Sequence, residues 1–252
     1  MLPIAFAGTQ NVGSISLSSS PINLDAGSSK DITCIATISD TDGWANITSV
    51  NATLWDTSAS TENSEDDDDE HYTDASCILG ENTSETERPI TCEFSLHYHA
   101  NPSTWTCKIR SYNSINDAAS NEVIVDVNEL AALDVTEASI DFGALDFNET
   151  STDKTATVQN IGNVQIDVQL SGSAFTCTSG SLLRNSVHYN ASSSIDYGLM
   201  AELTGTATTL DFDLAKSTGT SSTKLTYWKI KLPESGVGGT CSNLITFTAI
   251  SG

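Results

Sequence analysis

The chain has 252 residues, and its 33 acidic against 10 basic side chains give a formal charge of -23. Such a charge repels nucleic acid and anionic lipid, so neither is expected as a partner. Aromatic residues make up only 7% of the chain, and no long stretch repeats apolar residues at the helical period. We therefore expect an all-β protein, long enough for two domains of about 100–150 residues each.

The N-terminal stretch MLPIAFA, when extended, carries its large side chains Leu2, Ile4 and Phe6 on one face. Two interpretations stay open. Its AFA triplet has the small-x-small pattern that ends a signal peptide, although a charged n-region and most of an apolar h-region are missing. Alternatively, the stretch is a short apolar strand that inserts into a neighbouring subunit, with residues 8–13 as a flexible spacer.

The first predicted domain is a β-sandwich at residues 13–129, preceded by the apolar strand and spacer at residues 1–12. An acidic turn, DTDG at residues 40–43, lies between two of its strands. In the stretch 50–55, the alternation leaves open which face is buried, because Leu54 and Trp55 lie on opposite faces. The expected strand regions are 14–24, 31–38, 50–55, 91–98, 104–110 and 122–127.

The second predicted domain is a β-sandwich at residues 132–252, organised around residues 154–175. Apolar and polar residues alternate on both sides of the sequence NIGN at residues 160–163, which predicts two strands. Because Asn and Gly tolerate positive φ, we expect the two strands to form a tight antiparallel hairpin. Later strands are expected at 195–203, 209–214, 225–232 and 244–250.

The six cysteines form an even set without a CxxC pair, which argues against zinc ribbons and thioredoxin-like motifs. Six cysteines allow fifteen connectivities, and six buried free thiols are a further alternative. Disulfides imply an oxidising compartment and therefore export. The domain division favours the pairs Cys34–Cys107, Cys77–Cys92 and Cys177–Cys241.

Several N-x-S/T sequons make N-linked glycans an expected modification of an exported protein. A chain so rich in serine and threonine contains such sequons by chance, so they add nothing to the argument for export. The sequons begin at Asn46, Asn51, Asn82, Asn148 and Asn190.

Two clusters offer metal-ligand chemistry, and we expect both to be solvated. His97 and His99 share a face if they lie on a strand, but a third ligand cannot be named. The run EDDDDEH at residues 65–71 offers hard oxygen ligands for weak calcium binding, yet it lacks the glycine-spaced frame of an EF-hand. The smaller acidic turn at residues 40–42 is interpreted in the same way. No metal site and no cofactor are predicted.

Catalytic signatures are also missing. The chain has no GxSxG elbow, no HExxH and no glycine-rich phosphate loop. We therefore expect a protein that is not an enzyme.

The sequence resembles a known architecture in several places. Cys34 in an early strand, a downstream Trp and the late triplet Trp105-Thr106-Cys107 resemble immunoglobulin-like sandwiches, although those domains commonly have Tyr where Trp105 stands. DTDGWANITSVNATLWD, TATVQNIGNVQIDV and YWKIKLP resemble Ig-like or jelly-roll-like modules of exported archaeal surface proteins and, more weakly, donor-strand fibre subunits. This resemblance implies architecture and transfers no functional residues.

No stretch of about 20 apolar residues is present, so membrane insertion is not expected. We expect an extracellular structural subunit of a pilus-like filament or surface assembly, polymerising head-to-tail through Leu2, Ile4 and Phe6. Its expected partners are copies of itself and surface glycans of host or neighbouring cells. The alternative is a monomeric secreted adhesin or glycan-binding module whose mature form lacks residues 1–8.

Overall fold

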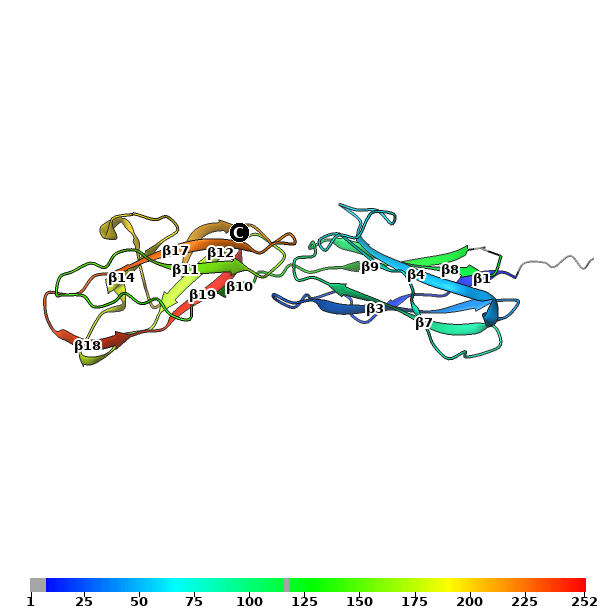
Figure 1. The fold of residues 1–252 in the computed structure, drawn as a ribbon, viewed down its shortest axis with the longest axis horizontal. Coiled ribbons are helices and arrows are strands. Elements are labelled where there is room, and N and C mark those ends of the chain that lie inside the picture. The colour runs from blue at the N-terminus through cyan, green and yellow to red at the C-terminus, as the bar shows by residue number, and fades with distance from the viewer. Residues whose placement is uncertain (1–7, 116–117) are drawn as a thin grey trace, which may run out of the picture. The chain divides into compact units, whose positions relative to one another are not determined.

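The computed structural model describes residues 8–115 and 118–252 and divides the chain into two compact units, Met1–Leu130 and Ala131–Gly252. In these described ranges the regular structure consists of β-strands and short 3₁₀-helices (Figure 1). The all-β prediction is confirmed. The 3₁₀-helices are η1 (Trp44–Asn46), η2 (Arg184–Ser186) and η3 (Tyr197–Leu199).

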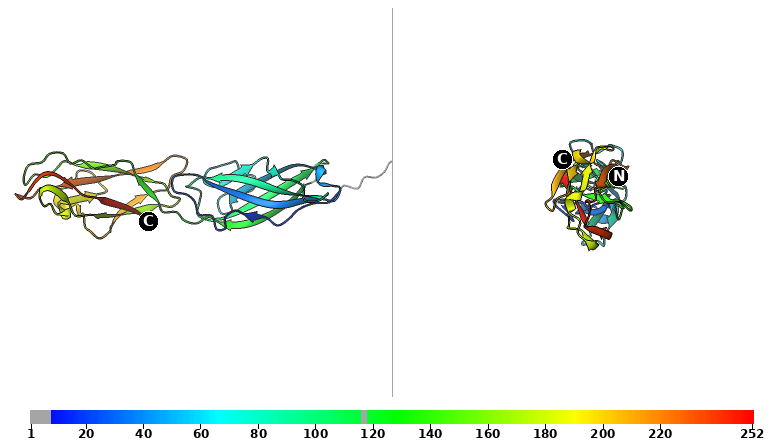
Figure 2. Two further views of the ribbon diagram at one scale, coloured as in Figure 1. Left: turned by 90° about the horizontal axis from the view of Figure 1, so that it is seen from below. Right: turned by 90° about the vertical axis from the view of Figure 1, so that its left-hand side faces the viewer.

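The strands of the first unit form two antiparallel sheets, seen from two sides in Figure 1 and Figure 2. One has the order β1-β3-β7-β6, with β2 also paired to β3, and the other has the order β5-β4-β8-β9. The strands are β1 (Gln10–Val12), β2 (Ser16–Leu17), β3 (Lys30–Asp40), β4 (Ile47–Asp56), β5 (His71–Asp74), β6 (Ile78–Leu79), β7 (Glu87–Leu96), β8 (Thr104–Asn113) and β9 (Ala118–Asp126).

Alternate residues of these strands bury one shared core between the two sheets. On β4 the buried face carries Val50, Ala52 and Leu54, and Trp55 lies on the half-buried opposite face. This assigns the face that the sequence pattern left open. Burial of such aliphatic side chains stabilises the folded state by about 1.5–3 kcal/mol each.

The fully buried Trp105 has a hydrogen bond that anchors the turn before β8. Its indole Nε1 donates to the backbone carbonyl of Asn101 over 3.0 Å. This bond fixes the start of β8 to the turn that precedes it.

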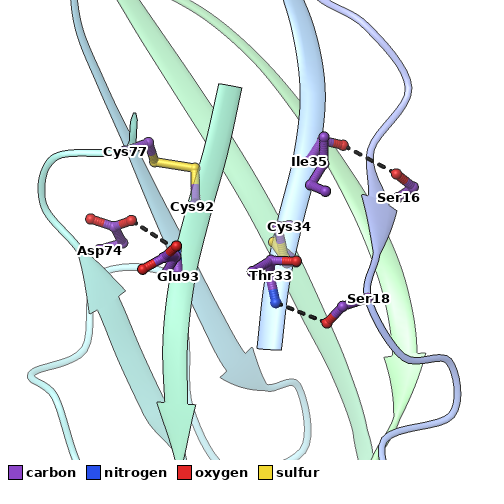
Figure 3. The surroundings of a disulfide bond; sticks show 10 residues. Ser16, Ser18, Thr33, Cys34, Ile35, Asp74, Cys77, Cys92 and Glu93 are labelled. Carbon is purple, nitrogen blue, oxygen red and sulfur yellow. Dashed lines mark hydrogen bonds between the residues drawn. A yellow bond between two sulfur atoms is a disulfide. The ribbon is translucent and has the colours of Figure 1, made fainter. Parts of the chain in front are cut away.

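Three disulfides join the six cysteines, in the pairs that the domain division favoured. Cys34 on β3 and Cys107 on β8 connect the two sheets of the first unit. In Figure 3, the bond from Cys77 to Cys92 lies beside the contact in which the Asp74 carboxylate accepts the backbone N–H of Glu93. Three disulfides indicate an exported, extracellular protein.

Two expectations for the start of the first unit are wrong. The flexible spacer at residues 8–13 contains β1, whose Gln10 and Val12 are buried and which pairs antiparallel with β3. The strand region at 14–24 contains only the short β2, followed by an isolated bridge from Ile22 to Val127. Pairing with the distant strand β3 decides both outcomes, and no local sequence pattern encodes that pairing.

The second unit has three antiparallel sheets, with the orders β10-β11-β17-β14-β15, β16-β12-β19 and β13-β18. Its strands are β10 (Leu133–Val135), β11 (Lys154–Asn160), β12 (Ile166–Gly172), β13 (Thr176–Gly180), β14 (Val187–Asn190), β15 (Ala201–Glu202), β16 (Thr208–Leu214), β17 (Ser222–Ile230), β18 (Val237–Ser242) and β19 (Ile245–Ser251). The strand expected at 195–203 is instead η3 followed by the two-residue β15.

The predicted hairpin at residues 154–175 is wrong. β11 pairs with β10 and β17, whereas β12 pairs with β16 and β19, so the chain crosses from one sheet to another between them. The fully buried Asn160 stabilises this crossing. Its Nδ2 donates to the carbonyls of Val164, Leu214 and Ala215, and its Oδ1 accepts the N–H of Gly162.

We predict that Asn160→Ala lowers the free energy of unfolding of the second unit by about 2–4 kcal/mol. The reason is that each buried polar group left unpaired costs about 1–3 kcal/mol. Urea unfolding measures the loss. Gln169→Ala is the matched control, since its amide makes only an exposed contact with Thr209. Equal losses in the two variants would contradict this role of Asn160.

Candidate functional site

The second unit has an open side between two strand edges. β10 pairs with β11 only from Val158 to Asn160, which leaves residues 154–156 without a strand partner on that edge. β19 pairs with β12 and ends its sheet, so within the described part of the chain its other edge is also unpaired. Unpaired edges are ready sites for strand addition.

A groove with both apolar and polar lining residues, Asp134 and Asp141 among the latter, lies on this side of the unit. It consists of two adjoining cavities of about 620 and 580 Å³, which share Ile140, Phe142, Phe175 and Cys241 in their walls. Further apolar lining residues of the groove are Leu133, Val135, Ala156, Leu182, Ile230, Leu232, Ile245 and Phe247. Ligand sites in proteins commonly enclose volumes of about 300–1,000 Å³.

The core beside the groove is incomplete. Val168 and Leu170 on β12 are fully buried, but Ile245 and Phe247 on the neighbouring β19 remain half-buried. Leu244 is 69% exposed where it lines the groove. Covering these side chains would remove apolar surface from water, which favours an apolar occupant.

Residues 136–149 lie over the groove without forming a strand, and Figure 1 shows a long loop between β10 and β11. Their Ile140, Phe142 and Leu145 are half-buried and line the cavities beneath. Gly143 has a φ of 78°, which glycine adopts without steric cost. The loop therefore covers the groove loosely and leaves the cavities open.

Glu137 attaches this loop to the unpaired edge of β11. Its carboxylate accepts the backbone N–H of Thr157 over 2.5 Å and the Thr157 hydroxyl over 2.7 Å. These bonds, the backbone one first, lower the pKa of Glu137. A side chain thus takes the acceptor position that a neighbouring strand would fill.

The residues expected to mediate polymerisation, Leu2, Ile4 and Phe6, lie outside the described residues. Their role stays a prediction. No catalytic residue was named from the sequence, so there is none to locate in the structure.

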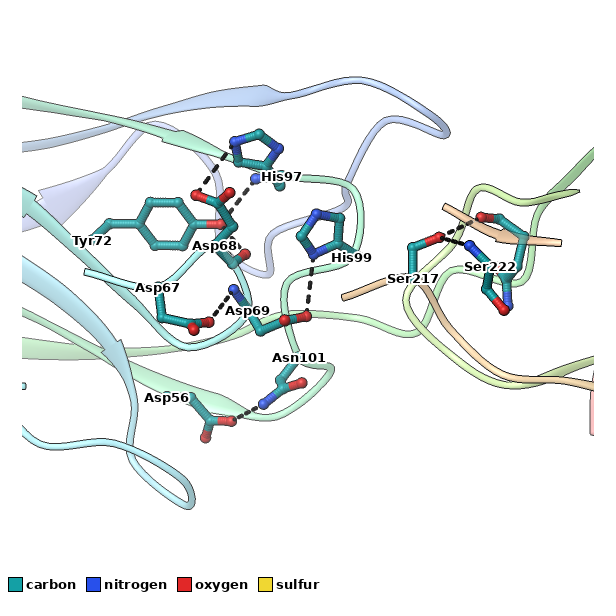
Figure 4. Close-up of polar contacts among 11 residues, drawn as sticks. Asp56, Asp67, Asp68, Asp69, Tyr72, His97, His99, Asn101, Ser217 and Ser222 are labelled. Carbon is teal, nitrogen blue, oxygen red and sulfur yellow. Dashed lines mark hydrogen bonds and ion pairs between the residues drawn. The ribbon is translucent and has the colours of Figure 1, made fainter. Parts of the chain in front are cut away.

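The acidic run and the histidines lie together in the first unit (Figure 4). Glu65–Asp68 are exposed, as expected, whereas the expectation that both histidines are solvated is wrong for His99. β7 ends at Leu96, so His97 and His99 lie in a turn and do not share a strand face. His99 is buried, and its Nδ1 lies 3.1 Å from Asp69. His97 Nε2 lies 3.5 Å from Asp68.

Further contacts fasten the connection between β4 and β5. The buried His71 lies 3.0 Å from Asp66 through its Nδ1. Tyr72 donates its hydroxyl to the carbonyl of Asp68, and burial raises the pKa of Tyr72. Glu62 pairs with Arg110 and Lys108, and its pKa is lowered by Arg110 first.

Two groups of side chains have the spacing of metal ligands, but neither is a sound site. Asp74 lies near Cys77 and Cys92, whose sulfurs are joined to each other. Asp167 lies near the exposed Asp211 and Asp213. One oxygen of Asp167 already accepts the N–H groups of Phe212 and Asp213, which lower its pKa.

The five sequons differ in exposure. Asn82 and Asn148 are exposed, and Asn148 has a φ of 61° in a turn. Asn46, Asn51 and Asn190 are half-buried. Exposed sequons in loops are the better acceptors for a bulky glycan.

No family model matches the chain, and no curated protein matches it. Distant likenesses exist among solved structures of β-sandwich proteins. A DUF4785 family protein of Legionella pneumophila is 7% identical with a TM-score of 0.31, over 94% of this chain and 47% of that one. Escherichia coli alpha-2-macroglobulin is 13% identical with a TM-score of 0.29, over 96% of this chain and 22% of that one.

A structure described as carbohydrate-binding modules of the β-sandwich superfamily is 11% identical with a TM-score of 0.30, over 98% of this chain and 99% of that one. At these TM-scores none of the likenesses bears on function. The chain spans less than half the length of the first two matched structures. Across the described residues, none of the helices has the length and apolar character needed to span a membrane.

We predict that Glu137→Gln destabilises the second unit in a pH-dependent way. A carboxylate whose pKa is lowered by folding stabilises the protein above its unfolded pKa of about 4.3, and this contribution is lost as the pH falls through the folded value. The difference from the parent protein in urea unfolding should therefore be largest above about pH 5 and shrink towards pH 3. Glu234→Gln, at an exposed position of the same unit, is the control. A difference that does not vary with pH would contradict the assignment.

We predict that the double variant Asp66→Asn, Asp69→Asn lowers the melting temperature at pH 6 by several degrees. Each change weakens a charge-assisted contact with a buried imidazole, and such contacts contribute about 1.5–3 kcal/mol. The control Glu65→Gln, Glu70→Gln removes the same charge from the same loop. If the two double variants melt alike, the run is merely solvated, as the sequence indicated.

Proposed function

We propose that this protein is a non-enzymatic structural subunit of an extracellular filament or surface assembly, joined by strand addition. In this proposal the groove of the second unit in one copy receives an apolar strand from the next copy. The observation that carries the proposal is a pair of unpaired edges, at residues 154–156 of β11 and along β19, with one open cavity between them and a second adjoining it. The three disulfides and the absence of a catalytic motif agree with an exported structural role.

The proposed occupant is the N-terminal stretch MLPIAFA of a neighbouring copy. It contains no charged side chain in a chain whose formal charge is -23, so it can enter the groove without burying a carboxylate. Seven extended residues span about 23 Å. β19 also has seven residues, which matches the donor to this edge in length, whereas the unpaired part of β11 offers three residues.

The connectivity favours a chain of subunits. The donor stretch precedes β1, which belongs to the first unit, whereas the acceptor groove belongs to the second unit. Each copy therefore offers one donor and one acceptor on different parts of its surface. Such a heterologous contact propagates when the rotation between copies does not close into a ring.

Side-chain burial and main-chain hydrogen bonding must both contribute to the free energy of strand insertion. Burying Leu2, Ile4 and Phe6 contributes roughly 4.5–9 kcal/mol, from about 1.5–3 kcal/mol each. Ordering seven residues costs about 1 kcal/mol or more per residue. Apolar burial alone thus roughly offsets the ordering, and hydrogen bonds to the strand edges supply the net affinity. Pro3 has no N–H and limits pairing on one side.

We predict that deleting residues 1–7 leaves both units folded but abolishes polymerisation, and that Ile4→Asp does nearly the same because its charge would have to be buried. Electron microscopy and size-exclusion chromatography of the purified protein measure the effect. Ala5→Ser, on the opposite face of the strand, is the control and should still polymerise. Filaments formed by the deleted protein would contradict the donor role. A full-length chain that stays monomeric in both measurements would instead favour the monomeric secreted adhesin or glycan-binding module.

We also predict that a synthetic peptide MLPIAFA binds the protein that lacks residues 1–7 and raises its melting temperature. The same peptide with Asp in place of Ile4 should have no effect. Phe247→Glu, which introduces a charge in the groove, should abolish binding of the original peptide. Binding that survives Phe247→Glu would place the acceptor site elsewhere.

A further inference from the structure

A buried carboxylate lies at the end of the first unit. Asp40 is the last residue of β3, on the inward face that also carries Ala36 and Ile38. Its side chain is 0% exposed. A charge at such a position is unfavourable unless it is paired or hydrogen-bonded.

Asp40 has little to compensate this charge. Its Oδ1 accepts the backbone N–H of Asp42 over 2.8 Å, but its Oδ2 is buried and has no hydrogen-bond partner. Among residues 8–115 and 118–252, no Lys, Arg or His side chain forms an ion pair with Asp40 or Asp42. Two neighbouring carboxylates therefore lack a positive partner.

Both carboxylates converge on the backbone of Gly8. A Cβ added to Gly8 would lie 2.5 Å from Asp40 Oδ1 and 2.8 Å from Asp42 Oδ2. Gly8 is itself buried. The neighbouring Thr9 is fixed to the same turn, since its N–H donates to Thr41 Oγ1 over 2.9 Å and its carbonyl accepts the N–H of Thr41. A side chain at this position would displace the two carboxylates.

We propose that Asp40 and Asp42 bind a cation beside Gly8. Two sources supply this chemistry. One source is a divalent cation such as calcium, which prefers carboxylate and carbonyl oxygens as ligands. The other is the α-ammonium group of Gly8 itself, because the preceding AFA triplet has the small-x-small pattern of a signal-peptidase site.

The second source requires a defined reaction. Water adds across the peptide bond between Ala7 and Gly8, which leaves the carboxylate of Ala7 and an amino group on Gly8 that takes up a proton. An α-nitrogen lies about 2.5 Å from its own Cβ position by standard geometry, so that of Gly8 is within about 5–6 Å of both carboxylate oxygens. The new charge would form beside the two unpaired anions.

The cation site does not depend on the proposed function. Calcium binding is compatible with a retained donor strand, whereas cleavage after Ala7 would remove that strand. The two proposals therefore fail separately. Polymerisation reports on the donor strand, and thermal stability of the first unit reports on the cation site.

The test compares the chain 1–252 with the chain 8–252, each melted in EDTA and in 10 mM calcium chloride at pH 7, a concentration chosen to be well above weak extracellular sites. Asp40→Asn is introduced into both chains. Asp31→Asn, at an exposed position of the same strand, is the matched control.

A calcium-dependent rise of several degrees in 1–252 that Asp40→Asn removes would support the divalent cation. A higher melting temperature of 8–252 in EDTA that Asp40→Asn or acetylation of the Gly8 amine removes would support the ammonium. Three results together would refute the cation site: calcium has no effect on either melting temperature, the two chains melt alike, and Asp40→Asn changes the melting temperature no more than Asp31→Asn does.

Discussion

The architecture of the second unit depends on how the edge of β11 is satisfied. A buried backbone N–H must find an acceptor, and along most sheets a neighbouring strand supplies it. Here the carboxylate of Glu137 supplies the acceptor for Thr157, and a loop follows where a strand would be. A single side chain cannot fill the space of a strand, and one cavity remains between β11 and β19, with a second cavity adjoining it. Pairing and packing are thus incomplete at the same place, which is where we propose that a strand from another copy inserts.

The sequence predicts strands well because alternation reports which face of a strand is buried. It does not report which strand lies alongside. The stretch 154–175 alternates in the same way whether its halves pair as a hairpin or enter two facing sheets. The buried amide of Asn160 decides between these arrangements through contacts with Leu214 and Ala215, more than 50 residues away along the chain. The domain division determines the pair Cys177–Cys241 and reduces the other four cysteines to three possible pairings, of which the structure has Cys34–Cys107 with Cys77–Cys92.

The groove and the histidine cluster could not be predicted for a related reason. The groove exists because a strand lacks a neighbour, and the sequence of one segment does not show whether a neighbour is present. ASIDFGAL at residues 138–145 has the apolar content of a paired strand, although it forms a loop. Acidic runs usually stay solvated, yet this one contacts imidazoles from His71 and from the turn after β7. Those contacts form when β5 and β7 are brought together by the fold. Local composition therefore misjudged the burial of His99.

The charge balance explains how this chain keeps its buried carboxylates ionised. Ten basic residues cannot pair with 33 acidic ones, so most stabilising contacts to the carboxylates come from neutral hydrogen-bond donors. Burial raises the pKa of Asp56, but hydrogen bonds from Ser58 and Asn101 help to outweigh it and leave that pKa lowered. Glu137 and Asp167 rely on backbone N–H groups in the same way. Since a carboxylate with a lowered pKa stabilises the fold above its unfolded pKa, each of these contributions is lost on acidification. Asp40 departs from the pattern, with one donor for two buried oxygens, and this shortage is what a cation beside Gly8 would remove.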